Sequence, residues 1–189
     1  MTREDSIKIV EELVQSPNIK KHCLAAEVVM LSLYDQLSRQ KKSPELTREA
    51  WGIVGLLHDA DYEVTEKKLE KHTEVVSERL TKLGTEKEII DAIRGHADKE
   101  KRTTLLAKAI YACDDLTGLI VAAALVRPDK KLSGLTVEST MKRFREPAFA
   151  RGANRELIET CESELDMPLK DFIEISLKAM QGIARELGL

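Results

Sequence analysis

The chain of 189 residues has few aromatic residues and no long apolar segment. Phe, Trp and Tyr make up only 4% of the residues, which argues against a surface that stacks nucleic-acid bases. No apolar run approaches the ~20 residues that a membrane-spanning helix needs. The first residues, MTREDSIKIV, are charged and already have helical spacing, so we expect no secretory signal. We therefore expect neither a nucleic-acid polymer nor a membrane as a partner.

Neither sign of charge dominates, and cysteine is scarce. Lys and Arg number 30 and Asp and Glu 33, so no basic field attracts the chain to nucleic acid. Cys23, Cys113 and Cys161 are far apart and form no CxxC pair, which favours cytoplasmic thiols over a disulfide framework. The length suits one domain with its own core.

Apolar residues recur at helical spacing almost throughout, and no segment alternates as a strand would. This pattern predicts an all-α bundle. Thr47 and Asn18 are predicted N-caps, Gly84 is a predicted C-cap, and Pro128 stops the longest helix. Helices are predicted over about 6–14, 19–37, 48–58, 69–83, 86–96, 103–126, 136–144 and 154–165, with a last one from 169 through 187.

The histidines are the most informative residues, because each falls on or beside the inward face of its predicted helix. Asp59 adjoins one of them, and Asp114 interrupts the apolar face of the longest helix. A single inward histidine is more often a core residue than a ligand, but the joint pattern indicates a metal site, because a buried carboxylate needs a partner or an ion. Imidazole and carboxylate groups projecting from several helices can bind zinc, iron or manganese. The residues concerned are His22, His58, Asp59, His72, His96 and Asp114.

The order of these residues resembles the H…HD…D signature of the HD superfamily of metal-dependent phosphohydrolases. The matching positions are His22, the His58-Asp59 pair in VGLLHDADYE, and Asp114 in AIYACDDLTGLIVAAALVRPDK. The tail over 139–165 is similar to that of small HDIG-related predicted hydrolases. The resemblance implies an HD-domain helical bundle within one domain, 1–189, with a core over about 19–126 and extra C-terminal helices over about 136–189.

The same resemblance implies the metal ligands. His22, His58, Asp59 and Asp114 match the core ligands, and His72 and His96 stand where some relatives have two more. We therefore expect a dinuclear site bridged by Asp59, with a site of one ion and four ligands as the alternative. The ions would be divalent, one or two of Mn, Fe, Co, Ni, Zn or Mg.

The activity implied by the resemblance is hydrolysis of a phosphomonoester or phosphodiester bond in a small metabolite or nucleotide, by a metal-activated water. Asp59, Asp61 and Asp115 are the catalytic candidates, the last two as groups that orient the water. Candidate phosphate-binding cations are Lys20, Lys99, Arg127, Arg143 and Arg145.

Other functions stay open from the sequence. No GYP segment follows His96, which counts against cyclic-di-GMP phosphodiesterase activity. Some relatives with the six-ligand pattern hold two irons and use O2 to oxidise their substrates, so the resemblance also allows that chemistry. A metal-binding sensing module without turnover is the third alternative.

Overall fold

The protein consists of helices joined by loops and contains no β-strand. The computed structural model describes residues 1–189. The elements are α1 (Arg3–Leu13), α2 (Pro17–Arg39), α3 (Arg48–Leu57), α4 (Glu74–Lys82), α5 (Lys87–His96), α6 (Leu105–Leu125), the short 3-10 helix η1 (Leu132–Gly134), α7 (Val137–Phe144), α8 (Arg155–Leu165), α9 (Leu169–Gly182) and α10 (Ala184–Leu187). The predicted all-α fold class is confirmed.

Capping residues define most helix ends. The Thr47 hydroxyl accepts the backbone N–H of Ala50 at the start of α3, as predicted. Gly84, with φ of 67°, follows α4 and also fulfils its predicted role. The prediction that Asn18 caps α2 is wrong: the N-cap is Ser16, because Pro17 occupies the first helical position, where it needs no N–H partner.

Two predicted helices differ from the structure. The helix predicted over 69–83 begins only at Glu74, and residues 58–73 form successive turns. Thr73, just before α4, has a left-handed backbone with φ of 70°, so the helical run cannot extend back through it. The last predicted helix breaks at Ile183, where the backbone leaves the helical region, and continues as α10.

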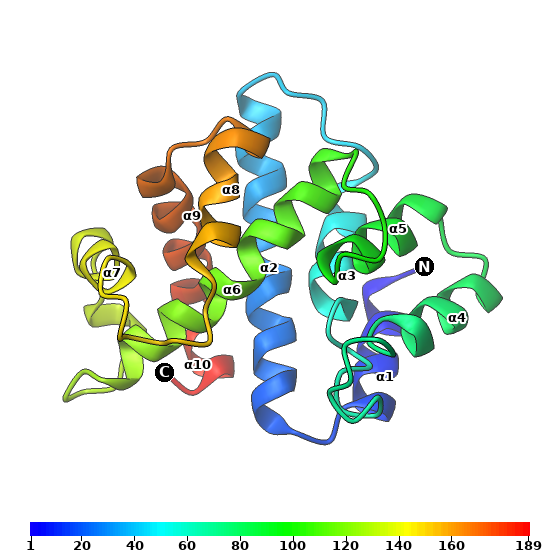
Figure 1. Cartoon of the computed structure of the whole chain (residues 1–189), viewed down its shortest axis with the longest axis horizontal. Coiled ribbons are helices and arrows are strands. Elements are labelled where there is room, and N and C mark those ends of the chain that lie inside the picture. Colours follow the sequence, from blue (N-terminus) through cyan, green and yellow to red (C-terminus); the bar gives the residue numbers. More distant parts are fainter.

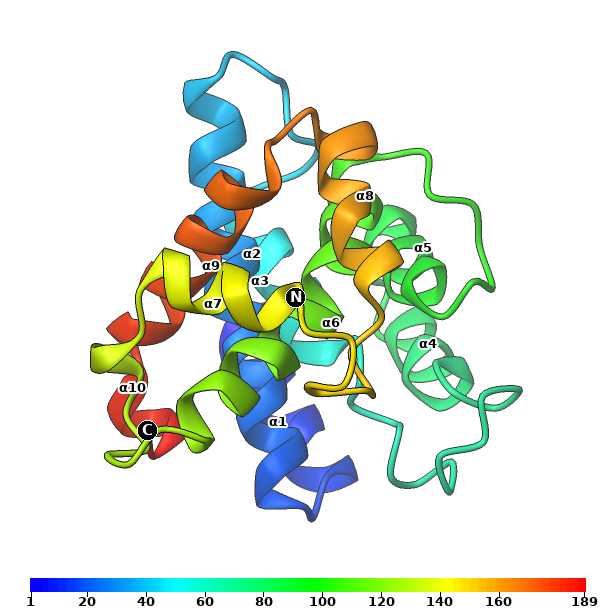
Figure 2. The same cartoon turned by 60° about the vertical axis from the view of Figure 1, so that its left-hand side comes forward.

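The long helix α2 is the centre of the arrangement (Figure 1). It packs against α3, α6 and α9. In Figure 1, α3, α4 and α5 lie on one side of α2, and α7 to α10 lie on the other. In Figure 2, α7, α9 and α10 again lie on the side of α2 away from α4 and α5. One cluster of 45 buried apolar residues, from Ile9 to Leu187, connects both sides. None of the helices has the length and hydropathy needed to cross a bilayer.

A glycine sets the distance between α2 and α3. A Cβ atom added at Gly55 would lie 2.7 Å from the backbone of Ala26. Only glycine therefore permits this close crossing. The crossing brings the C-terminal end of α3, where the HD pair stands, beside the first turns of α2, which carry His22.

Candidate metal centre

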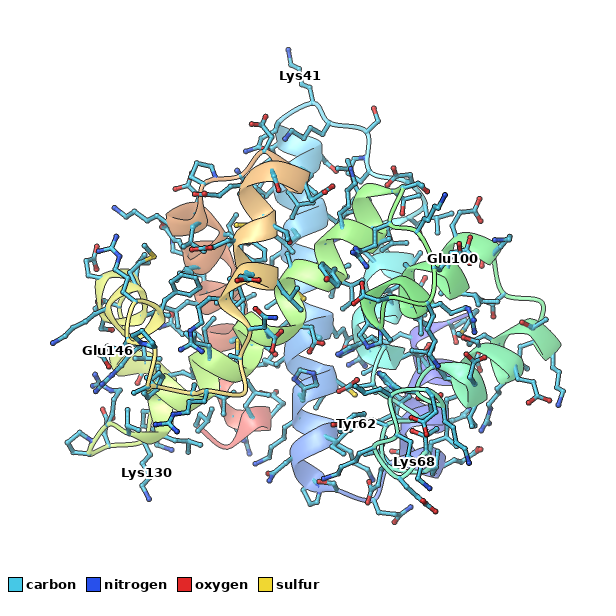
Figure 3. The ribbon with its side chains drawn as sticks, viewed as in Figure 1. Lys41, Tyr62, Lys68, Glu100, Lys130 and Glu146 are labelled. Atoms are coloured by element: carbon cyan, nitrogen blue, oxygen red, sulfur yellow. The ribbon has the colours of Figure 1, made fainter.

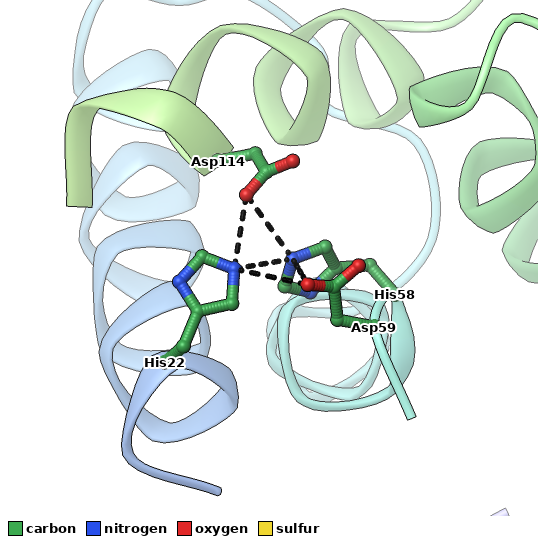
Figure 4. Close-up of side chains that lie close together, drawn as sticks. All are labelled: His22, His58, Asp59 and Asp114. Carbon is green, nitrogen blue, oxygen red and sulfur yellow. Dashed lines mark hydrogen bonds and ion pairs between the residues drawn. The ribbon is translucent and has the colours of Figure 1, made fainter. Parts of the chain in front are cut away.

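Four side chains from three helices converge beside the crossing of α2 and α3 (Figure 4). His22 projects from α2, His58 and Asp59 stand at the end of α3, and Asp114 projects from α6. Their ligand atoms all lie within 4.8 Å of one another. The Nε2 atoms of His22 and His58 are 3.0 Å apart, and Asp114 Oδ1 is 2.9 Å from the first and 3.5 Å from the second.

A second cluster of donors shares Asp59 with the first. His72, in the turns before α4, and His96, at the end of α5, have Nε2 atoms 3.0 Å apart. Asp59 Oδ1 lies 3.1 Å from His72 Nε2 and 3.6 Å from His96 Nε2. The other oxygen, Asp59 Oδ2, lies 3.5 Å from His22 Nε2. The two oxygens of one carboxylate thus face the two clusters.

Every one of these histidines has its Nδ1 atom beside a hydrogen-bond acceptor. The Thr117 hydroxyl donates to the carbonyl of Asp114, which leaves its oxygen to accept from His22. The acceptors are Thr117 Oγ1 for His22 (3.1 Å), the Gly55 carbonyl for His58 (2.8 Å), Asp61 Oδ1 for His72 (2.9 Å) and the Ile93 carbonyl for His96. A proton on each Nδ1 leaves the lone pair on Nε2, the atom that points into the clusters.

This donor set fits a cation. Lone pairs that face each other at 3.0 Å repel unless a proton or a cation lies between them. Burial alone would lower the pKa of His22, but its hydrogen bond to Asp114 and the nearby carboxylates raise that pKa to about 9. His72 behaves in the same way, with a pKa of about 9 caused by Asp59 and Asp61. The carboxylates therefore create a field that favours positive charge at both clusters.

Asp61 supports the site from behind and does not face the cavity. Its side chain is fully buried. Oδ1 accepts from His72 Nδ1 and from the backbone N–H of Thr73, and Oδ2 accepts from the N–H of Val76. Both oxygens are occupied, so the expectation that Asp61 orients the attacking water needs correction. Asp61 holds His72 in place and caps α4.

Asp115 does face open space beside the first cluster. It lines a cavity of about 240 Å³ together with His22, Asp114 and Gly118. Burial, and then the charge of Asp114, raise the pKa of Asp115 to about 6. Arg155 holds the loop on the far side of this cavity: its guanidinium donates to three carbonyl groups of the loop and to the carbonyl of Phe144 at the end of α7.

The main cavity, of about 540 Å³, contains donors from both clusters. Tyr62 and Leu69, from the turns between α3 and α4, border it, and Tyr62 lies edge-on to His72 with ring centroids 5.3 Å apart. No Lys or Arg side chain lines this cavity.

Three of the five predicted phosphate-binding cations pair with groups outside the clusters. Arg127 pairs with Asp129, Arg143 pairs with Glu146, and Lys99 donates to Glu74 and to two backbone carbonyls. Lys20 and Arg145 line none of the three cavities that meet at His22. Figure 3 shows Lys130 and Glu146 far from Tyr62 at the main cavity. Sequence spacing did not reveal the partners of Lys99, Arg127 and Arg143, and the assignment of the five cations to substrate binding stays a prediction.

A further cation, which directly precedes His22 in the sequence, lines a neighbouring cavity. Lys21 lines a third cavity, which also contains His22. Asn18 and Ala25, which line the same cavity, stand four residues before and three residues after His22 and so share its face of α2.

The family relationship agrees with this geometry. The HD domain family model matches residues 19–119, more than half of the chain, and this range contains both clusters. The chain belongs to the HD domain family. This match confirms the family predicted from the sequence. HD domains bind divalent metals and are generally metal-dependent hydrolases. A search of curated proteins and a search of solved structures return no match.

Proposed function

We propose that this HD domain is a phosphohydrolase that acts on a small phosphoester with the help of two divalent ions. The observation that carries the proposal is the position of Asp59 between two clusters of imidazole donors, one oxygen toward each. His22, His58, Asp59 and Asp114 would hold one ion, and Asp59, His72 and His96 would hold the other. Bound divalent ions lower the pKa of a water toward neutrality and stabilise negative charge on a phosphoryl group.

The chain itself supplies orientation and a shaped cavity. Thr117, Asp61 and two backbone carbonyls keep the four imidazoles in the tautomer that a ligand needs. The main cavity lacks Lys and Arg, so the chain's own cations do not balance the charge of a phosphoryl group there. This favours metal-dependent chemistry over phosphate capture by arginine.

Asp115 remains the candidate for orienting a water molecule. Its carboxylate borders the cavity beside His22 and Asp114, where it can accept a hydrogen bond from a water between them. It is the only one of the two predicted water-orienting aspartates with an accessible position.

Phosphate release tests the reaction. The protein is incubated with Mn²⁺ or Co²⁺ and a panel of phosphomonoesters and phosphodiesters, with and without O2. We expect metal-dependent release that does not depend on O2 and that falls at least about 100-fold in Asp114→Ala. Substrate-dependent O2 uptake without phosphate release would instead identify the oxygenase alternative.

Metal analysis tests the number of ions. The double variant His72→Ala/His96→Ala removes two of three donors from the second cluster, so bound metal should fall from two ions per chain to one. Lys71→Ala, an exposed neighbour in the same turns, serves as the control and should keep both ions. Unchanged stoichiometry in the double variant would contradict the dinuclear site.

A further inference from the structure

A groove of about 380 Å³ runs between α2 and α6 and begins at His22; we call it the α2–α6 groove. Its walls are mainly apolar, with Ala25 from α2, Val121 and Leu125 from α6, and Leu187 at its end from α10. Leu125 is 48% exposed, which is unusual for a large apolar residue on a helix that is otherwise mostly buried. The groove thus offers an apolar surface that the fold leaves uncovered.

The groove adjoins the metal centre. Asn18 and His22 line both the main cavity and the groove. The His22 imidazole therefore stands at the junction, with Nε2 toward the donors and Nδ1 toward Thr117 on the groove wall. A ligand whose phosphoryl group lies at the donors can extend past His22 into the groove.

Gly118 keeps this space open. It stands within α6, one turn after Asp114, and it is exposed. A Cβ atom added there would meet no atom within 4 Å, so no packing contact requires a glycine. Glycine inside a helix is unfavourable for stability. Since Gly118 lines both the groove and the cavity of Asp115, its absent side chain is best explained by the room that it leaves for a ligand.

Lys21 gives the groove a single positive charge. It is the only Lys or Arg among the lining residues, and its ammonium forms no ion pair or hydrogen bond in the structure. Its Nζ lies near Gly188, 2.9 Å from where a Cβ on that residue would be. Arg127 and Arg143, in contrast, are already paired with carboxylates. An unpaired, half-buried cation beside apolar walls suits a ligand with an anionic group on an apolar body.

We propose that the α2–α6 groove binds the organic part of the substrate, and that this part is apolar and carries an anionic group that pairs with Lys21. This inference rests on the proposed phosphohydrolase function for its biological meaning. The groove's ability to bind an apolar anion is a property of the chain itself and can be measured without turnover.

The first experiment measures binding of 8-anilinonaphthalene-1-sulfonate, an apolar aromatic anion whose fluorescence rises in apolar surroundings. The wild-type protein should bind it saturably, with one molecule per chain. Gly118→Leu should weaken binding at least tenfold, because the new side chain fills the groove. Lys21→Ala should weaken it at least threefold, because the anionic group loses its partner.

Matched controls separate the groove from general effects on the fold. Gly182→Leu places the same side chain at another exposed helical glycine with free space, and Lys20→Ala removes a neighbouring charge that does not line the groove. Both should bind the probe within twofold of wild type. Gly118→Ala should raise the Tm by about 2–4 °C, because alanine favours the helix, and should still weaken binding. Wild-type affinity in Gly118→Leu, or equal losses in Lys20→Ala and Lys21→Ala, would overturn the proposal.

A second experiment connects the groove to the reaction. The ratio of kcat/KM for 1-naphthyl phosphate to that for phenyl phosphate should exceed one in the wild type and fall at least fivefold in Gly118→Leu. If the wild-type protein binds the probe but hydrolyses neither ester, the proposed function is refuted and the groove's binding of an apolar anion still stands. Hydrolysis with an unchanged ratio, together with unchanged probe binding, would refute the groove alone.

Discussion

At the scale of single residues, the most consequential contacts are those behind the imidazoles. Asp61 is buried and does not line the cavity. Its carboxylate fixes the tautomer of His72 and the start of α4. Groups of this kind affect metal affinity although they never touch the ion, because they orient the ligand and adjust its basicity.

Asp61→Asn should therefore weaken the second metal site selectively. The amide keeps one acceptor but loses the charge that favours a proton on His72 Nδ1. We expect about 10- to 100-fold weaker binding of one ion and little change in the other. Titration with Mn²⁺, followed by counting bound metal, measures both. Asp35→Asn, which alters a carboxylate paired with Arg48 on the surface, should change neither.

Residue identity in the sequence predicted the donors but not the supporting groups. The four histidines, Asp59 and Asp114 stand out because they interrupt apolar faces, and the structure brings all of them together. A charge in a sequence does not reveal its partner: Arg127 follows the helix of Asp114 yet pairs with Asp129, two residues away. Likewise, Asp61 looked like an accessible acid because its bonds come from residues 11 to 15 positions later.

At the scale of elements, helical periodicity predicted most of the bundle. The helix prediction failed over 69–73. Leu69 and His72 have the spacing of an amphipathic helix, but the chain forms turns there. The cause is tertiary, because the Asp61 carboxylate takes the N–H groups of Thr73 and Val76 and so fixes where α4 can begin. His72 thus reaches the cavity from a turn and not from a helix face.

The close crossing of α2 and α3 makes a prediction at this scale. Gly55→Ala places a methyl group 2.7 Å from the backbone of Ala26, so the helices must separate. We expect the free energy of unfolding to fall by about 1–3 kcal/mol, as overpacking generally costs. Urea denaturation measures this loss. Metal affinity should also fall, since His58 would move away from His22, whereas Gly182→Ala should lose neither stability nor metal.

At the scale of the whole molecule, the metal centre joins segments that are distant in the chain. Its donors come from α2, the ends of α3 and α5, the turns before α4, and α6. An ion that binds only when these segments are assembled stabilises the folded state by mass action.

Removal of metal should therefore lower the melting temperature. With free Mn²⁺ at about 100 times its dissociation constant, stabilisation by one ion is about 2.7 kcal/mol, or roughly 5–10 °C for a chain of this size. Scanning calorimetry with chelator and with added Mn²⁺ measures the difference. The variant His22→Ala should show a smaller shift than wild type, and an equal shift would place the ion elsewhere.

The shared carboxylate of Asp59 has a consequence for how the protein fills. With an ion bound in each cluster, filling one cluster would withdraw negative charge from the Asp59 carboxylate and fix its position, which would change the affinity of the other cluster. Loading should then deviate from two independent isotherms, and the deviation must be reciprocal, of the same size whichever position is filled first.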